Sequence, residues 1–130
     1  MTPRASGRRQ SCTTADGKAR LHDAEAFLDT AETAADSDVK ATNAIHAGIA
    51  AADAICCFAL RERAGDANHA AAIDLLRTVD AQLAATLGRL LGRKQQAAYE
   101  SRDISTKDAA TCMRQASTLV DAARSRALKA

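Results

Sequence analysis

Aromatic side chains are nearly absent from this chain, which has no tryptophan, one tyrosine and two phenylalanines among 130 residues. Proteins that bind single-stranded nucleic acid usually stack the bases on aromatic side chains. A stacking RNA binder is therefore disfavoured. Proline occurs once and glycine six times, so few residues interrupt helices, and alanine is abundant. This composition favours helix along the whole chain.

Paired cysteine motifs are also missing, because none of the four cysteines belongs to a C-x-x-C pair. Cys56 and Cys57 are adjacent on an expected helix, where their side chains diverge by about 100° and cannot form an unstrained bridge. We interpret Cys12, Cys56, Cys57 and Cys112 as reduced thiols, the central ones as small core residues. The N-terminus has no apolar run after its basic residues, and residues 44–60 are slightly too short and too polar for a membrane span. A soluble cytoplasmic protein is expected.

The familiar motifs of catalysis and metal binding are absent too. The sequence contains no glycine-rich phosphate loop, no nucleophile elbow and no zinc-knuckle spacing. The histidines, His22, His46 and His69, do not have metal-ligand spacing, and the two Glu-x-x-His repeats of a di-metal bundle are missing. We expect no metal and no cofactor.

Charge is segregated along the chain although the net charge is only +2. Residues 21–88 are acidic, whereas residues 89–130 are basic. These two regions can pair within one fold or between two copies of it. The alternative is a phosphate-facing surface formed by Arg89, Arg93, Lys94 and Arg102.

The apolar periodicity predicts an all-α protein. Residues 1–15 are polar and basic, and we expect a disordered tail there. Residues 16–130 then form one domain, an up-and-down bundle of four to five helices, with no strand signal. Five helices are expected: residues 16–36, a second from a cap at Ser37 and Asp38 to about residue 64, a short third from a cap at Asp66 after a left-handed Gly65, a fourth from Asp80, and a last one from a capping box at Ser105.

The central helix carries two polar side chains within an apolar run. In residues 44–60 these are His46 and Asp53. Seven residues make almost two turns, so both lie on one face, about 10.5 Å apart along the axis. A helix that is apolar nearly all round is expected to be buried, so both groups need partners or a function.

For Asp53, the expected partners are Arg93 and Tyr99 of the late basic segment. This would be a buried pair that fastens the second helix to the fourth. Alternatively, the three side chains line a polar notch for a nucleotide, a phosphate or a partner's side chain. His46 is expected to be a core or interface residue, with ligand binding as the alternative.

A second candidate site combines Arg63 and His69. An arginine and a histidine can position a phosphate and transfer a proton, as metal-independent RNA cleavage requires. The simpler interpretation is that Arg63 stabilises the dipole at the end of the second helix and that His69 only occupies the first turn of the third.

The order of these features resembles the HEPN domain, the helical higher-eukaryote and prokaryote nucleotide-binding module. The resemblance rests on AEAFLDTAETAAD, NAIHAGIAAADAIC, DANHAAAIDLLRTV and the closing segment from GRKQQAAYES onward, and it covers about residues 18–126. It is greatest to small stand-alone bacterial members. Ribonuclease members have an arginine followed by a histidine near the start of a late helix. Here that place holds Arg93 with Ala98 and Tyr99, without a histidine, which implies the non-catalytic branch.

Three functions are therefore open. The first is a non-catalytic HEPN-like module, a homodimer that binds a nucleotide, RNA or a protein partner through Asp53, Arg93, Tyr99 and His46. The second is a toxin-type ribonuclease that uses Arg63 and His69. The third is a purely structural helical interaction subunit.

Overall fold

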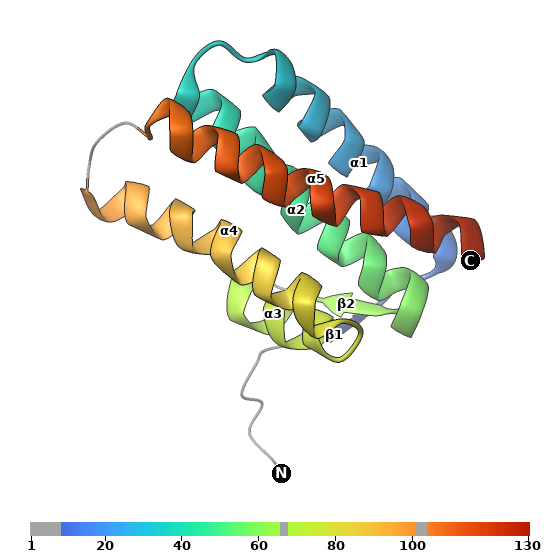
Figure 1. The fold of residues 1–130 in the computed structure, drawn as a ribbon. Coiled ribbons are helices and arrows are strands. Elements are labelled where there is room, and N and C mark those ends of the chain that lie inside the picture. Colours follow the sequence, from blue (N-terminus) through green and yellow to red (C-terminus); the bar gives the residue numbers. More distant parts are fainter. Residues whose placement is uncertain (1–8, 66–67, 101–103) are drawn as a thin grey trace.

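The fold is an all-α bundle with a small two-stranded sheet at one end (Figure 1). The structure is a computed structural model that describes residues 9–65, 68–100 and 104–130, with the backbone alone for residues 94–100. The predicted fold class is confirmed. The elements are β1 (Arg9–Ser11), α1 (Thr14–Thr33), α2 (Ser37–Leu60), β2 (Glu62–Ala64), α3 (His69–Arg77), α4 (Ala81–Glu100) and α5 (Thr106–Lys129).

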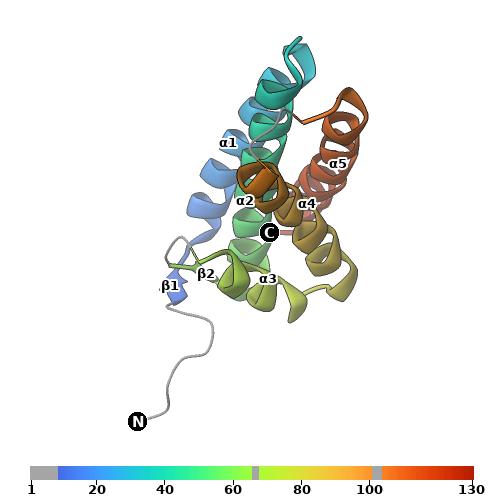
Figure 2. The ribbon, with the colours of Figure 1, turned by 90° about the vertical axis from the view of Figure 1, so that its left-hand side faces the viewer.

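Helix α2 is the centre of the bundle. It contacts α1, α5, α4, α3 and β2, and the perpendicular view in Figure 2 shows α1 and α5 on either side of it. Most of its core residues are alanines, so its neighbours approach closely. At Gly48 an added Cβ would lie 2.4 Å from Leu90 Cδ2 of α4 and 3.3 Å from Leu119 Cδ1 of α5. Both leucines are fully buried, so only glycine fits at this crossing.

Helix caps account for most of the boundaries. Asp80 accepts a hydrogen bond from the Leu83 N–H, and Ser105 caps α5, both as predicted. The cap of α2 is Asp36, one residue before the predicted start. Asp38 instead accepts from the backbone N–H of Ile104 at 2.7 Å and thereby fastens the start of α5 to α2.

The C-terminal end of α2 differs from the prediction. The helix stops at Leu60, not near residue 64, because Arg61 adopts the left-handed conformation, with φ 58°, that was expected of Gly65. Helix α3 is capped by Asn68. The cap predicted at Asp66 lies outside the described residues.

The expectation of no strands is also wrong. Strand β1 pairs antiparallel with β2, with Gln10 opposite Arg63. The predicted tail of residues 1–15 is consequently structured from residue 9 onward, since residues 9–11 form β1 and α1 begins at Thr14. Residues 1–8 lie outside the described part. Three-residue strands carry almost no periodic signal, which explains the error.

A disulfide joins Cys12 to Cys57, with their Cα atoms 5.1 Å apart. The interpretation of these two cysteines as reduced is therefore wrong. Their sequence separation is 45 residues, and such a connection cannot be deduced from spacing. Cys56 and Cys112 are free and buried, and burial raises the pKa of Cys56 to about 12.

Helix α2 is long and apolar enough, by length and composition alone, to cross a membrane. Of the apolar window that meets this test, 72% is buried inside the bundle. This is the behaviour of a core helix.

Candidate functional site

Asp53 is the only buried charged side chain in the part of the chain that the structure describes, at 8% exposure. Its Oδ2 accepts a hydrogen bond from Arg20 Nη2 at 3.1 Å. Arg63 Nη1 lies 3.5 Å from the same oxygen. Three elements therefore meet at this carboxylate, since Arg20 belongs to α1, Asp53 to α2 and Arg63 to β2.

The close contact between α1 and α2 places Arg20 at this position. An added Cβ at Gly17 would lie only 2.7 Å from Phe58 Cε1, so the two helices can come this near only with glycine there. Arg20 follows three residues later, on the same face of α1. The early end of α2 at Leu60 turns the chain into β2, which brings Arg63 back beside Asp53.

Burial and the two arginines act in opposite directions on Asp53. Desolvation raises the pKa of Asp53 above its usual range, while the charges of Arg20 and Arg63 and the hydrogen bond from Arg20 oppose this rise. Arg20 also donates from Nη1 to Asp23 at 3.1 Å. Its Nε is buried without a hydrogen-bond partner. The ion network is consequently only partly satisfied.

Toward the residues that the structure describes, the Arg63 guanidinium keeps unused N–H donors. Its side chain is 30% exposed, and its ion pair with Asp53 is not accompanied by a hydrogen bond from its guanidinium among the residues the structure describes. A guanidinium carries five N–H donors. Arg63 can therefore bind a second acceptor without leaving Asp53.

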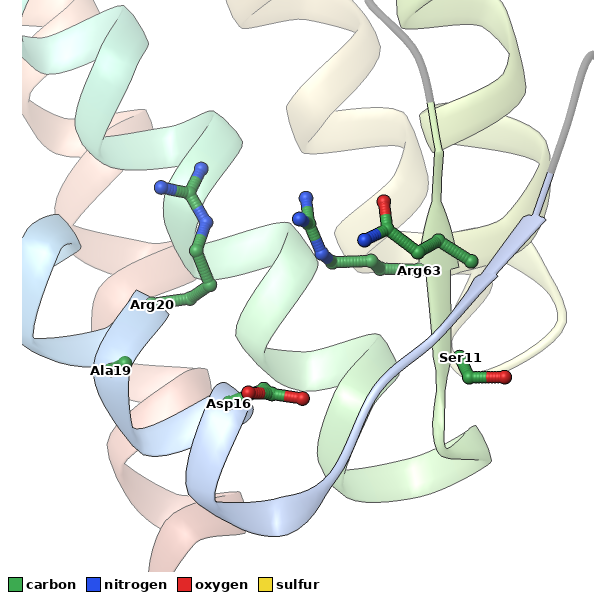
Figure 3. Close-up of a pocket in the computed structure, with 6 residues that line it drawn as sticks. Ser11, Asp16, Ala19, Arg20 and Arg63 are labelled. Carbon is green, nitrogen blue, oxygen red and sulfur yellow. The ribbon is translucent and has the colours of Figure 1, made fainter.

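An open pocket of about 210 Å³ lies directly beside these arginines. Figure 3 shows Arg20 extending from α1 and Arg63 from β2 toward the same space, with Asp16 below. Asp16 caps the start of α1 with Thr13, and the backbone hydrogen bond of Thr13 lowers the pKa of Asp16. The pocket is lined by Gln10, Ser11, Asp16, Ala19, Arg20 and Arg63.

Arg93 is not part of this site. Its Nη1 lies 2.6 Å from Asp108 Oδ1, so it joins α4 to the first turn of α5. The predicted pair of Asp53 with Arg93 is wrong, because the carboxylate faces α1 and β2. The side chain of Tyr99 lies outside the described residues, as do those of Lys94 and Arg102 from the alternative basic surface.

His46 is exposed, so it is not a core residue, and its expected role at an interface stays a prediction. Its ring packs on Phe27 of α1, with the ring centroids 5.3 Å apart. The strand pair lies at the C-terminal end of α2 (Figure 1), where Arg63 of β2 contacts Asp53. The two residues share a helix face, but only Asp53 is covered.

Arg63 and His69 occupy different elements. Arg63 is in the middle of β2 and not in the last turn of α2, so its expected role at the helix dipole is wrong. His69 is the first residue of α3, as expected. The connection between them includes residues 66–67, which lie outside the described part.

Within residues 9–65, 68–93 and 104–130, no three His, Cys, Asp or Glu side chains gather in a way that could hold a metal ion. Comparison with protein-family models, curated proteins and solved structures finds no match.

Proposed function

We propose that this chain is a non-catalytic, HEPN-like helical binding module that docks a protein partner by seating one carboxylate between Arg20 and Arg63. A single observation carries the proposal. Two guanidinium groups reach the same oxygen of a buried carboxylate and also line an open pocket. One arginine would suffice to pair Asp53, and the second leaves its donors facing the pocket.

A carboxylate is the ligand that suits these donors. Arginine binds carboxylates and phosphates through two parallel N–H···O bonds, and charge-assisted bonds of this kind are about twice as strong as neutral ones. Asp53 holds both guanidinium groups in place before a ligand arrives, so less side-chain entropy is lost on binding.

The pocket favours a single carboxylate over a nucleotide. Its volume of about 210 Å³ is below the roughly 300–1,000 Å³ of small-molecule sites. None of its lining residues is aromatic, so a base would have no stacking surface. The carboxylates of Asp16, Asp23 and Asp53 also lie near the two arginines, and they would repel a phosphate dianion more strongly than a monoanion.

We propose a homodimer in the bacterial cytoplasm, with a nucleotide or RNA as the competing ligand. A purely structural role for the network around Asp53 is the other alternative, and it predicts no binding at the pocket.

Titration of the ¹⁵N-labelled protein with acetate, N-acetylglutamate, inorganic phosphate and AMP tests the proposal. We expect the two carboxylates to shift the backbone amide signals of Gln10, Ser11 and Arg63. Arg63→Gln should weaken this binding at least about tenfold, because a hydrogen bond to a charged group contributes about 1.5–3 kcal/mol. Arg63→Lys should restore only part of it, since an ammonium cannot bind in the bidentate manner.

The matched control is Arg77→Gln. Arg77 lies on α3 and, among the residues that the structure describes, pairs only with Asp74, three residues before it, with both side chains about half exposed. This variant should bind acetate like the original protein. Equal binding by Arg63→Gln, or no response to either carboxylate, would refute the proposal. Tighter binding of AMP than of N-acetylglutamate would favour the nucleotide alternative instead.

The ribonuclease alternative has a separate test. It requires Arg63 to contact RNA rather than Asp53, and it requires His69 as the proton-transfer group. An RNA cleavage assay on the original protein, Arg63→Gln and His69→Ala decides it. Cleavage that both substitutions abolish would overturn the non-catalytic assignment, whereas we expect no cleavage.

A further inference from the structure

We propose that the Cys12–Cys57 disulfide is a redox-sensitive link that holds β1 in place and so controls the pocket. The consequence for ligand binding rests on the proposed function, whereas the consequence for β1 does not. The bond joins the residue that directly follows β1 to the central helix α2.

Strand β1 has little else to hold it. It contains three residues, all exposed, and within the described residues its one strand partner is β2, to which Arg9 adds an exposed ion pair with Glu62 at 3.8 Å. One further backbone bond, from the Cys12 N–H to the Arg61 carbonyl, measures 2.9 Å. An isolated two-stranded ribbon is at best marginally stable in water. The disulfide is therefore the strongest connection between β1 and the bundle.

The strand supplies one wall of the pocket. Gln10 and Ser11 are lining residues, and Gln10 lies opposite Arg63 in the ladder. If β1 separates from β2, the pocket loses that wall and Arg63 loses its neighbouring strand. We expect the carboxylate-binding site between Arg20 and Arg63 to be lost in the same step.

Reduction requires a thiol donor, which we take to be a cellular dithiol. Its thiolate attacks one sulfur, the S–S bond breaks, and the electron pair leaves on the other sulfur, which takes up a proton. The second thiolate of the donor then attacks the mixed disulfide and releases the other cysteine. Two electrons pass to the protein, giving the Cys12 and Cys57 thiols, and the donor becomes a disulfide. Cys12 is 3% exposed and Cys57 is fully buried, so attack follows a local opening of β1.

The neighbouring thiol does not interfere with this chemistry. Cys56 is 3% exposed, and burial raises its pKa to about 12, so almost none of it is the reactive thiolate. The bond therefore opens and recloses between the same two sulfurs. In a cytoplasmic protein, disulfides are usually transient and redox-sensing. A reversible, redox-sensitive Cys12–Cys57 bond is compatible with the predicted cytoplasmic location.

Hydrogen exchange of the backbone amides of residues 9–12 tests the link without any ligand. The full chain is measured oxidised and after treatment with dithiothreitol, with free thiols counted by alkylation and mass spectrometry. We expect two additional thiols on reduction and exchange at residues 9–12 at least about tenfold faster through local opening. The α5 amides exchange on global unfolding, so they should remain much slower than residues 9–12 in the reduced protein. Cys12→Ala should match the reduced protein in either condition, and Cys56→Ala should respond like the original.

Acetate titration of the same samples tests the consequence for binding. We expect the reduced protein to bind at least about tenfold more weakly than the oxidised protein. Unchanged exchange at residues 9–12 after the two thiols have appeared would show that the disulfide does not hold β1. Four free thiols in protein kept under oxidising conditions would show that the disulfide does not form. If reduction speeds exchange at residues 9–12 but leaves the acetate affinity equal, the disulfide holds β1 without controlling the pocket. If oxidised protein binds no carboxylate, the proposed function fails, and the exchange result still decides whether the disulfide holds β1.

Discussion

Replacing Cys12 by alanine should lower the free energy of unfolding substantially. The disulfide closes a loop with a sequence separation of 45 residues. Chain-entropy reasoning gives about 4 kcal/mol for a loop of this length, because the link restricts the unfolded chain. The whole stability of a small domain is about 5–15 kcal/mol. For a chain of this size the loss corresponds to a fall of roughly 10–20 °C in Tm.

The assay is guanidinium chloride unfolding of oxidised protein, followed by circular dichroism. The control is Cys56→Ala, which truncates a neighbouring buried thiol and leaves the disulfide intact. In dithiothreitol the original protein should lose stability and approach Cys12→Ala, while the variant itself should not change. A loss below about 1 kcal/mol in Cys12→Ala, or no effect of dithiothreitol on the original protein, would show that the disulfide does not stabilise the fold in this way.

Two further predictions concern packing and pH. Gly48→Ala should destabilise the protein by about 1–3 kcal/mol in the same assay, because the new Cβ meets a buried leucine at 2.4 Å. Gly92→Ala has nothing within 4 Å of the new Cβ and should stabilise the protein by up to about 1 kcal/mol. Equal effects of the two substitutions would contradict the close helix crossing at Gly48. The pKa of Asp53 is raised above 3.8, so the native state binds the proton of this carboxyl group more tightly than the unfolded chain does. The contribution of Asp53 to stability therefore falls as pH rises from 3.8 through the raised pKa, and Asp53→Asn should remove that fall. Asp16 has a lowered pKa and should act oppositely, with stability lost as pH falls below 3.8, and persistence of this acid-side loss in Asp16→Asn would contradict the assignment.

The sequence predicted the helical bundle well, because long amphipathic segments and caps are local signals. The caps at Asp80 and Ser105 lie where their side chains suggested. The end of α2 was missed, because Gly65 was the obvious residue for a left-handed position and the chain uses Arg61 there. A non-glycine residue in this conformation leaves no mark in the sequence.

The site was only half predictable. That Asp53 needs cationic partners follows from its place in an apolar helix, but which arginines supply them depends on how the chain folds back. Arg20 was missed altogether, although Gly17 one turn earlier is a signal of close helix contact. The sequence spacing associates Arg63 with His69 and not with Asp53. The position of Arg63 depends on β1 and β2, which are too short to predict.

Arg63 can bind an external carboxylate while it remains beside Asp53. The most direct measurement is the ¹H–¹⁵N signal of the arginine side-chain Nε–H groups in the oxidised protein during an acetate titration. We expect a saturable shift of the Arg63 signal that is absent from Arg77. An Arg63 signal that stays unchanged up to saturating acetate would contradict it and would leave the network around Asp53 a purely structural element.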